Sequence, residues 1–158
     1  MTRVFAAALL AACSFAAGAA PAASGKVTRV IDGQTVMLQR AEGAPVQVQL
    51  AGIVAPALCQ PWGPEARDAL KELVFQLNVS VRDPVTDRSG RLTGELMLDK
   101  VDIGSRMVEE GNAWSVRTKW DRGPWVKQER VAKALGRGLH AMAGVQAPRP
   151  GQPRPVCP

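Results

Sequence analysis

The segment from Val27 to Pro56 constrains the fold of this chain most strongly. It contains VTRVIDGQTVML and VQVQL, in which apolar residues largely alternate with polar ones. This period is typical of β-strands that bury one face. Asp32-Gly33 interrupts the first stretch with residues that favour a tight turn, which predicts a hairpin, and Gly43 marks a second turn. Three antiparallel strands so close in sequence predict the first half of a small, strongly coiled barrel.

The rest of the chain supplies helices and two further strands. Pro64 suits the first turn of a helix, and an apolar stripe at helical spacing follows it as far as about residue 76. Further strands are predicted near 79–85 and 91–98, a short helix over 102–110 and a last helix over 124–135. Five strands with a helix inserted after the third predict an α+β protein built on an OB-fold, a five-stranded Greek-key β-barrel with about three helices.

The two ends of the chain differ in composition from this domain. Residues 1–23 combine Arg3, an apolar run and a small-residue zone, which predicts a signal peptide and export to the periplasm or the medium. A competing interpretation is that Leu10–Cys13 resembles a bacterial lipoprotein box, in which Cys13 would carry a lipid anchor. No later stretch is long enough to predict a membrane span. The folded domain is predicted over 24–143, followed by a proline-rich, basic tail over 144–158.

Two cysteines remain beyond the predicted signal peptide, Cys59 and Cys157. In an exported chain such a pair predicts one disulfide, and two free thiols are the alternative. The disulfide would close a loop of about 100 residues, for which the chain-entropy model gives roughly 4–5 kcal/mol of stabilisation. It would also hold the tail against the domain.

An ordered set of segments resembles the thermonuclease (staphylococcal-nuclease-like) family. The set runs from about Lys26 to Leu139 and consists of IDGQTV, QLAGIVAPALCQPWGPEA, SGR at 89–91, GNAW at 111–114 and an ExxAK helix at 129–133. The resemblance implies an OB-fold and a calcium-dependent hydrolysis of DNA and RNA phosphodiesters. That chemistry needs carboxylates to bind the metal, a carboxylate to activate water, and two arginines to hold the phosphate.

Most positions that the resemblance assigns to this chemistry carry other residues here. They are Gln34 and Val54 for metal-binding carboxylates, Ala55 for a backbone ligand, Gln49 for a phosphate-binding arginine and Ala57 for the proposed base. Arg91, in the SGR segment, is retained. We therefore expect no catalytic residue, no metal site and no cofactor, with calcium bound only if an altered site is still active. Carboxylates that could form a relocated site are few, namely Asp32, Glu65, Asp83 and Asp87.

A basic and aromatic loop could bind a ligand instead. The candidate residues for contact with nucleic acid or phosphate are Arg91, Arg117, Lys119, Trp120 and Arg122. OB-folds bind single strands by aromatic stacking in a basic groove, and a net charge of +6 favours anionic partners. Arg149 and Arg154 of the tail would extend such a patch. In the alternative interpretation this is a solvated loop with a tryptophan packed on the barrel, and the sequence leaves open where Trp120 and Trp125 point.

The function predicted from these observations is that of an exported, catalytically degenerate thermonuclease-like protein. It would act as a binding module for nucleic acid, another anionic polymer or a protein partner. An active metal-dependent phosphodiester nuclease with an altered site is one alternative. An extracytoplasmic accessory or structural subunit is another.

Overall fold

A computed structural model of this chain describes residues 23–158. The predicted signal peptide and Cys13 lie outside the described residues, except for Ala23 at the end of that peptide. Ala23 begins the first strand and pairs with Val81, so this strand starts earlier than the apolar alternation predicts. Between residues 23 and 158, no helix has the length and apolar character needed to cross a membrane.

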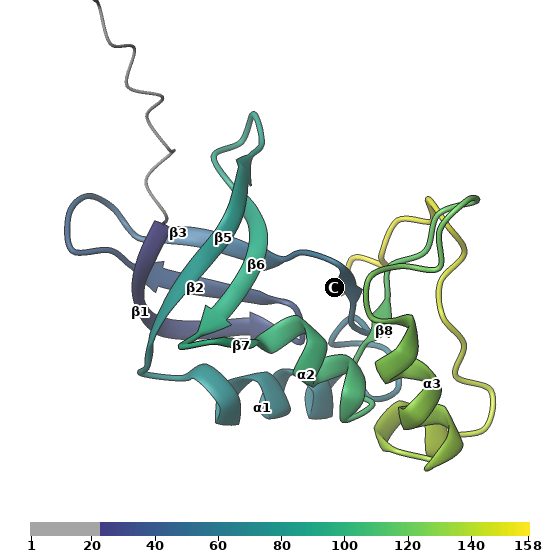
Figure 1. The fold of residues 1–158 in the computed structure, drawn as a ribbon. Helices are drawn as coiled ribbons and strands as arrows, with labels where there is room; N and C mark the ends of the chain where they lie inside the picture. The colour runs from purple at the N-terminus through teal and green to yellow at the C-terminus, as the bar shows by residue number, and fades with distance from the viewer. Residues whose placement is uncertain (1–22) are drawn as a thin grey trace, which may run out of the picture.

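Five strands close into the predicted barrel (Figure 1). They are β1 (Ala23–Asp32), β2 (Thr35–Gln39), β3 (Val46–Leu50), β5 (Asn78–Thr86) and β6 (Leu92–Leu98). In the sheet these five strands run in the order β3-β2-β1-β5-β6, a short sixth strand pairs with β6, and a parallel pairing of β3 with β6 closes the barrel. The OB-fold prediction is confirmed, including the hairpin at Asp32-Gly33 that joins β1 to β2.

Three α-helices and several short elements complete the domain. They are β4 (Ile53–Val54), α1 (Gly63–Val74), β7 (Val101–Asp102), α2 (Ile103–Glu109), β8 (Trp114–Ser115), α3 (Val126–Ala134) and the 3-10 helix η1 (Gly138–Ala141). The three α-helices lie where the sequence predicts them. The pairing of β4 with β8 is not predicted, and it fixes the start of the loop that leads to α3 beside the barrel.

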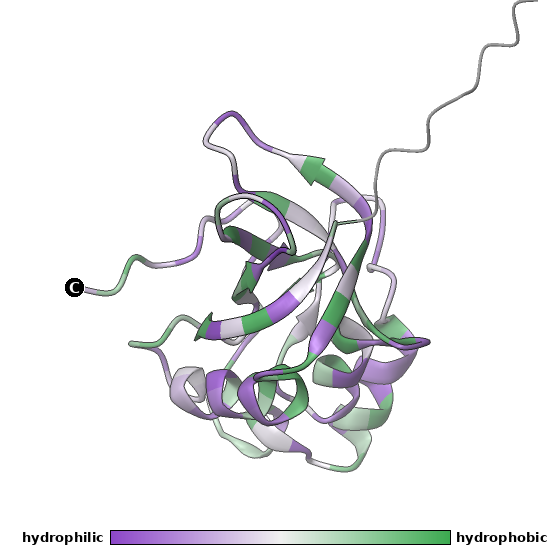
Figure 2. Cartoon of the chain, turned by 90° about the vertical axis from the view of Figure 1, so that its left-hand side faces the viewer, coloured by the Kyte–Doolittle hydropathy of each residue, from purple (hydrophilic) through white to green (hydrophobic). Residues whose placement is uncertain are grey.

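The core follows from the alternation along the strands, which Figure 2 shows as hydrophobic and hydrophilic residues in turn. Most inward side chains of the strands and the centre of the apolar stripe on α1 are buried; these residues include Val27, Val36, Leu38, Val48, Leu50, Ala66, Leu70 and Val74. Burial of this apolar surface is the main term that stabilises the barrel. It also gives the rim of the barrel, where the candidate site lies, a rigid support.

Candidate functional site

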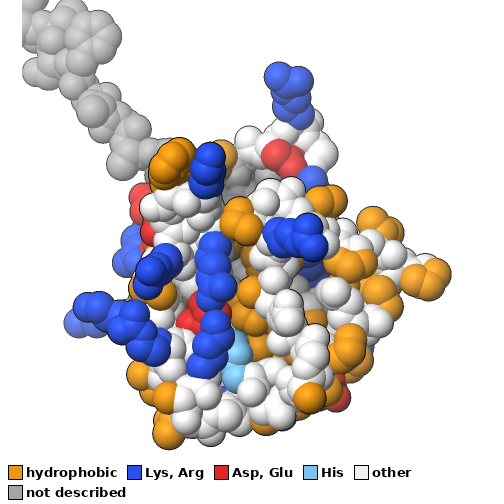
Figure 3. Space-filling model, turned by 90° about the vertical axis from the view of Figure 1, so that its right-hand side faces the viewer, with side chains coloured by type: hydrophobic (Ala, Val, Ile, Leu, Met, Phe, Trp, Pro, Cys, Tyr) orange, Lys and Arg blue, Asp and Glu red, His pale blue; other side chains and the backbone are white. Residues whose placement is uncertain are grey.

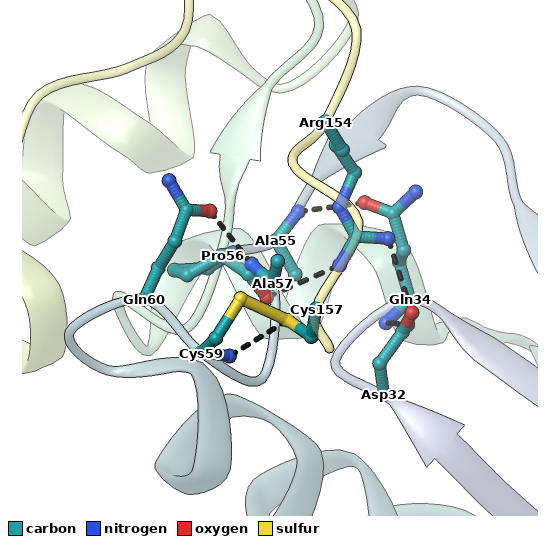
Figure 4. Close-up of polar contacts among 9 residues, drawn as sticks. All are labelled: Asp32, Gln34, Ala55, Pro56, Ala57, Cys59, Gln60, Arg154 and Cys157. Atoms are coloured by element: carbon teal, nitrogen blue, oxygen red, sulfur yellow. Dashed lines mark hydrogen bonds and ion pairs between the residues drawn. A yellow bond between two sulfur atoms is a disulfide. The ribbon is translucent and has the colours of Figure 1, made fainter.

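Gln34, Ala55 and Ala57, three of the positions that the resemblance assigns to catalysis, lie at one end of the barrel. The β1–β2 turn, the segment after β4 and the C-terminal tail come together there (Figure 4). The strand register aligns Thr35 of β2 with Gln49 of β3, and Gln49 with Thr93 of β6. The fold therefore places Gln34, Gln49 and Ala55 on neighbouring segments of the barrel.

Gln34 is used to hold the backbone of the site together. Its side chain is buried, and its Oε1 accepts a hydrogen bond of 2.8 Å from the backbone N–H of Ala55. Its own backbone N–H donates to Asp32 Oδ1 at 2.9 Å. The neutral amide oxygen is thus already engaged, and it brings no charge to the site.

The other substituted positions offer hydrocarbon or neutral groups. Ala55 and Ala57 are buried, and Val54 is half-buried in β4. The backbone N–H of Ala57 donates to Gln60 Oε1 at 2.8 Å, so an amide satisfies this turn as well. Nowhere in the described part of the chain do three His, Cys, Asp or Glu side chains gather as a metal-binding group. Calcium takes six to eight oxygen ligands, typically including several carboxylates. The side chains of Val54, Ala55 and Ala57 offer no oxygen, so these positions do not fit calcium.

Asp32, the carboxylate at this turn, faces a guanidinium from the tail. Arg154 Nη1 lies 3.1 Å from Asp32 Oδ2, and Arg154 Nη2 donates to the carbonyl oxygen of Pro56 at 3.2 Å. Both side chains are mostly buried, with 24% of Arg154 and 18% of Asp32 exposed. Arg154 therefore points into the site, whereas the sequence predicted that it would extend an outer basic patch. The predicted disulfide Cys59–Cys157, which ties the tail to the segment after β4, is present.

Arg91 and the carboxylates of Glu65, Asp83 and Asp87 lie on other segments than the β1–β2 turn. Hydrogen bonds from the Ser89 hydroxyl and from the backbone of Arg91 and Ser89 lower the pKa of Asp87 to about 2. Arg91 Nε in turn lies 3.0 Å from Asp87 Oδ2, at the exposed turn between β5 and β6. Asp83 adopts a positive φ within β5, and Glu65 lies in the first turn of α1. The structure does not gather Asp32 and these carboxylates into a group of three or more that could hold a metal ion.

A basic cleft lies on a different face, between α3 and the loop that precedes it. Its volume is about 400 Å³, and its lining comprises Arg117, Arg122, Val126, Glu129, Arg130 and Lys133. Figure 3 shows the Lys and Arg side chains gathered on this face. Four cationic side chains against one carboxylate give the lining a net formal charge of +3. We refer to these six residues as the α3 cleft.

Glu129 is the buried member of the α3 cleft and forms ion pairs with two of its cations. Its side chain is 2% exposed, Lys133 Nζ lies 2.8 Å from its Oε1, and Arg117 pairs with the same oxygen. Burial alone raises the pKa of Glu129, but the hydrogen bonds from Lys133 and Arg117 outweigh it and lower the pKa below its ordinary value. Sequence reasoning missed this role, although the ExxAK motif places Glu129 and Lys133 four residues apart on a helix, the spacing of an ion pair.

The tryptophans of the predicted loop point in opposite directions. Trp120 is 87% exposed, and Lys119 Nζ lies 5.0 Å from the centre of its ring. Trp125 is half-buried and packs against the core. Arg149 of the tail lines a small cleft of about 80 Å³ together with Arg117, so the tail does add one cation to this side of the molecule.

Comparisons with known proteins agree with this geometry. The family described as "Staphylococcal nuclease homologue" matches residues 47–141. "Micrococcal nuclease" of Shigella flexneri is 34% identical over 137 residues, which cover 78% of this chain and 77% of that protein. "Protein ParB" of Escherichia coli is 37% identical over 103 residues, 59% of this chain and 57% of that protein.

A plant relative matches a shorter part of its own sequence. "Probable staphylococcal-like nuclease CAN3" of Oryza sativa is 33% identical over 102 residues, which cover 65% of this chain but only 27% of that protein. The chain thus spans about a quarter of the length of this relative. The family match covers more than half of the chain, and the barrel and helices agree with it. The chain belongs to the staphylococcal nuclease family.

Proposed function

We propose that this chain is a nucleic-acid-binding member of the staphylococcal nuclease family that has lost metal-dependent hydrolysis. One observation carries the loss: Gln34, Val54 and Ala57 put an amide and two hydrocarbon side chains at the positions where the resemblance requires carboxylates. The amide is already bonded to the Ala55 N–H. Without carboxylates there is little electrostatic attraction for a divalent ion.

The expected effect on rate is large. Loss of a positioned general base typically lowers a rate by ~10²–10⁴, and loss of a charge-stabilising donor by about 10²–10³. Ala57 and Gln49 stand at those two positions. The factors need not multiply, but either one would take the activity below that of an ordinary nuclease.

The α3 cleft supports the binding half of the proposal. Arg122 and Arg130 line it without being partners of Glu129 among the described residues, so their charges are available for phosphates. The exposed ring of Trp120 lies on the same loop and can stack on an unpaired base, which contributes about 1–3 kcal/mol per base in single-strand binding. Several of the relatives are named nucleases, which makes nucleic acid the first polymer to test.

The test of lost hydrolysis compares the chain with a restored variant. Single- and double-stranded DNA and RNA are incubated with the oxidised protein in calcium, magnesium, manganese or chelator, and cleavage is followed on gels. We expect no metal-dependent cleavage. The variant with Gln34→Asp, Gln49→Arg, Val54→Asp and Ala57→Glu should gain calcium-dependent thermal stabilisation, because it regains a ligand set. Metal-dependent cleavage by the unmodified chain that Arg91→Ala abolishes would instead identify an active nuclease with an altered site.

The test of binding uses fluorescence anisotropy of a labelled single-stranded oligonucleotide over a range of salt. Each phosphate contact contributes about 0.7 to the slope of log K against log salt for single strands. The double variant Arg122→Ala/Arg130→Ala should therefore lower the slope by roughly 1.4, and Trp120→Ala should weaken binding with little change in slope. The matched control is Arg40→Ala, on the β2–β3 loop at the opposite end of the molecule (Figure 1). An absence of both binding and cleavage would favour a protein partner or an accessory role.

A further inference from the structure

The C-terminal tail lies across the site and is held there covalently. Cys157 is bonded to Cys59 with 5.5 Å between their Cα atoms, and the backbone N–H of Cys59 donates to Cys157 Sγ at 2.9 Å. Three residues before Cys157, Arg154 reaches the β1–β2 turn (Figure 4). A bond between two cysteines that are 98 residues apart in sequence therefore determines which side chain fills the site.

The contacts of Arg154 are those of a bound cation. Its two terminal nitrogens each meet an oxygen, the carboxylate of Asp32 and the carbonyl of Pro56. A guanidinium keeps its charge at every pH at which proteins are folded, and its planar fork presents two N–H groups to two oxygens at once. The oxygens that remain in this degenerate site thus serve a cation that belongs to the chain itself.

We propose that Asp32 and Pro56 form a guanidinium site whose resident ligand is Arg154, and that the Cys59–Cys157 disulfide controls its occupancy. When the bond is intact the site is closed by Arg154. When the bond is broken the tail leaves, and the site accepts a guanidinium compound from solution.

Within residues 23–158, the hydrogen bonds that tie the tail to the domain come from Cys157 and Arg154. The tail's polar contacts between residues 146 and 153 include a local turn, in which Gln152 N–H donates to the Arg149 carbonyl and Arg149 N–H to Gln152 Oε1. A cleft of about 250 Å³ separates it from Val54 and Trp114 of the domain. Holding a flexible segment still costs conformational entropy, and a covalent link close to Arg154 raises its effective concentration at Asp32. Loss of the link should therefore release Arg154 together with the segment before it.

The controlling step is ordinary thiol–disulfide exchange. Cys59 is exposed and Cys157 is half-buried, so a dithiol reductant can reach the bond. The reductant supplies two electrons and two protons; the Sγ–Sγ bond breaks, two cysteine thiols form, and the reductant becomes a disulfide.

A double-mutant cycle on the full chain tests the coupling. It comprises the unmodified protein, Arg154→Ala, Cys59→Ser/Cys157→Ser and the triple variant, each followed by thermal unfolding. We expect Arg154→Ala to lower Tm by about 4–8 °C in the crosslinked protein and by less than about 1 °C without the crosslink. Arg149→Ala, on the same tail, is the matched control and should change Tm by less than about 1 °C in both backgrounds.

Two results of the cycle would overturn the proposal. An equal loss in both backgrounds would mean that Arg154 occupies the site without help from the disulfide. No loss in the crosslinked protein would mean that Asp32 and Pro56 do not form a guanidinium site. The thermal-unfolding measurements of the cycle do not involve nucleic acid, so both outcomes are independent of the proposed function.

A second measurement identifies the ligand class and does not depend on the stability of the variants. Methylguanidinium at about 10 mM should raise the Tm of crosslinked Arg154→Ala, and of the dithiol-reduced unmodified protein, more than that of the oxidised unmodified protein, whose site is filled. Methylammonium is the control for charge without the planar fork. An equal rise in all forms, or a larger effect of methylammonium or calcium, would contradict a guanidinium site.

Discussion

At the scale of single residues, the candidate site is held together by hydrogen bonds from neutral amides. Gln34 illustrates this, because its buried Oε1 satisfies the N–H of Ala55 across the turn. We expect Gln34→Ala to lower the free energy of unfolding by about 1–3 kcal/mol, since it leaves a buried donor unpaired. Gln39→Ala, an exposed glutamine on β2, should stay within about 0.5 kcal/mol. Urea denaturation measures both, and equal losses would contradict this role of Gln34.

Glu129 makes a residue-scale prediction that depends on pH. Its pKa in the folded protein lies below the ordinary value of 4.5, so the unfolded chain binds its proton more readily. Its contribution to stability is therefore complete above pH 4.5 and is lost as the pH falls through the lower folded pKa. The difference in stability between the unmodified protein and Glu129→Gln should be constant from pH 6 to 7 and shrink below about pH 4.5. Chemical denaturation at a series of pH values checks this, and a difference that grows in acid would refute it.

At the scale of elements, α2 and η1 are joined by a contact between two glycines. Gly111 and Gly138 both have positive φ, and the N–H of Leu139 donates to the carbonyl of Gly111 at 2.9 Å. A Cβ at Gly111 would lie 2.2 Å from the carbonyl oxygen of Arg137. The sequence predicted a helix that ends at residue 110, and the structure adds that no side chain fits at Gly111.

The prediction for this contact compares two glycines with similar backbone conformations. Gly136 also has positive φ, but nothing lies within 4 Å of where its Cβ would be. Gly136→Ala should therefore lower the free energy of unfolding by about 1 kcal/mol, the strain of the left-handed conformation alone. Gly111→Ala should lose roughly 1–3 kcal/mol more, because the backbone of residues 137–139 has to move. If urea denaturation gave similar losses in the free energy of unfolding for the two variants, the close approach of Gly111 to the backbone of Arg137 would not contribute to stability.

The same scale shows which elements local sequence could predict. Apolar residues recur every second position along the strands of the barrel and once per helical turn along α1. The positions of these elements agree with the prediction within a few residues. The pairing of Ile53–Val54 with Trp114–Ser115 has no such signal, because two-residue strands have no period. It depends on the packing of α2 against the barrel, which only the folded chain determines.

At the scale of the whole molecule, the candidate site could be located from sequence but its occupant could not. The resemblance placed Gln34, Val54 and Ala57 at one site, and the structure brings their segments together. Arg154 is 122 residues from Asp32 in sequence, and the Cys59–Cys157 disulfide ties its segment to the domain beside the site. Cysteine counting predicted the bond, but not the side chain that the bond delivers to the site.

The last prediction concerns the crosslink as a constraint on the entire chain. In the chain-entropy model a loop of 98 residues stabilises the fold by about 4–5 kcal/mol, through the ensemble of unfolded conformations. Reduction should therefore lower the urea midpoint and raise the m-value, because the released unfolded chain expands and exposes more surface. Arg154→Ala, which keeps the crosslink, should lower the midpoint less and leave the m-value unchanged. If reduction lowered stability no more than Arg154→Ala does, the disulfide would act only by placing the tail, and the unfolded chain would be compact without it.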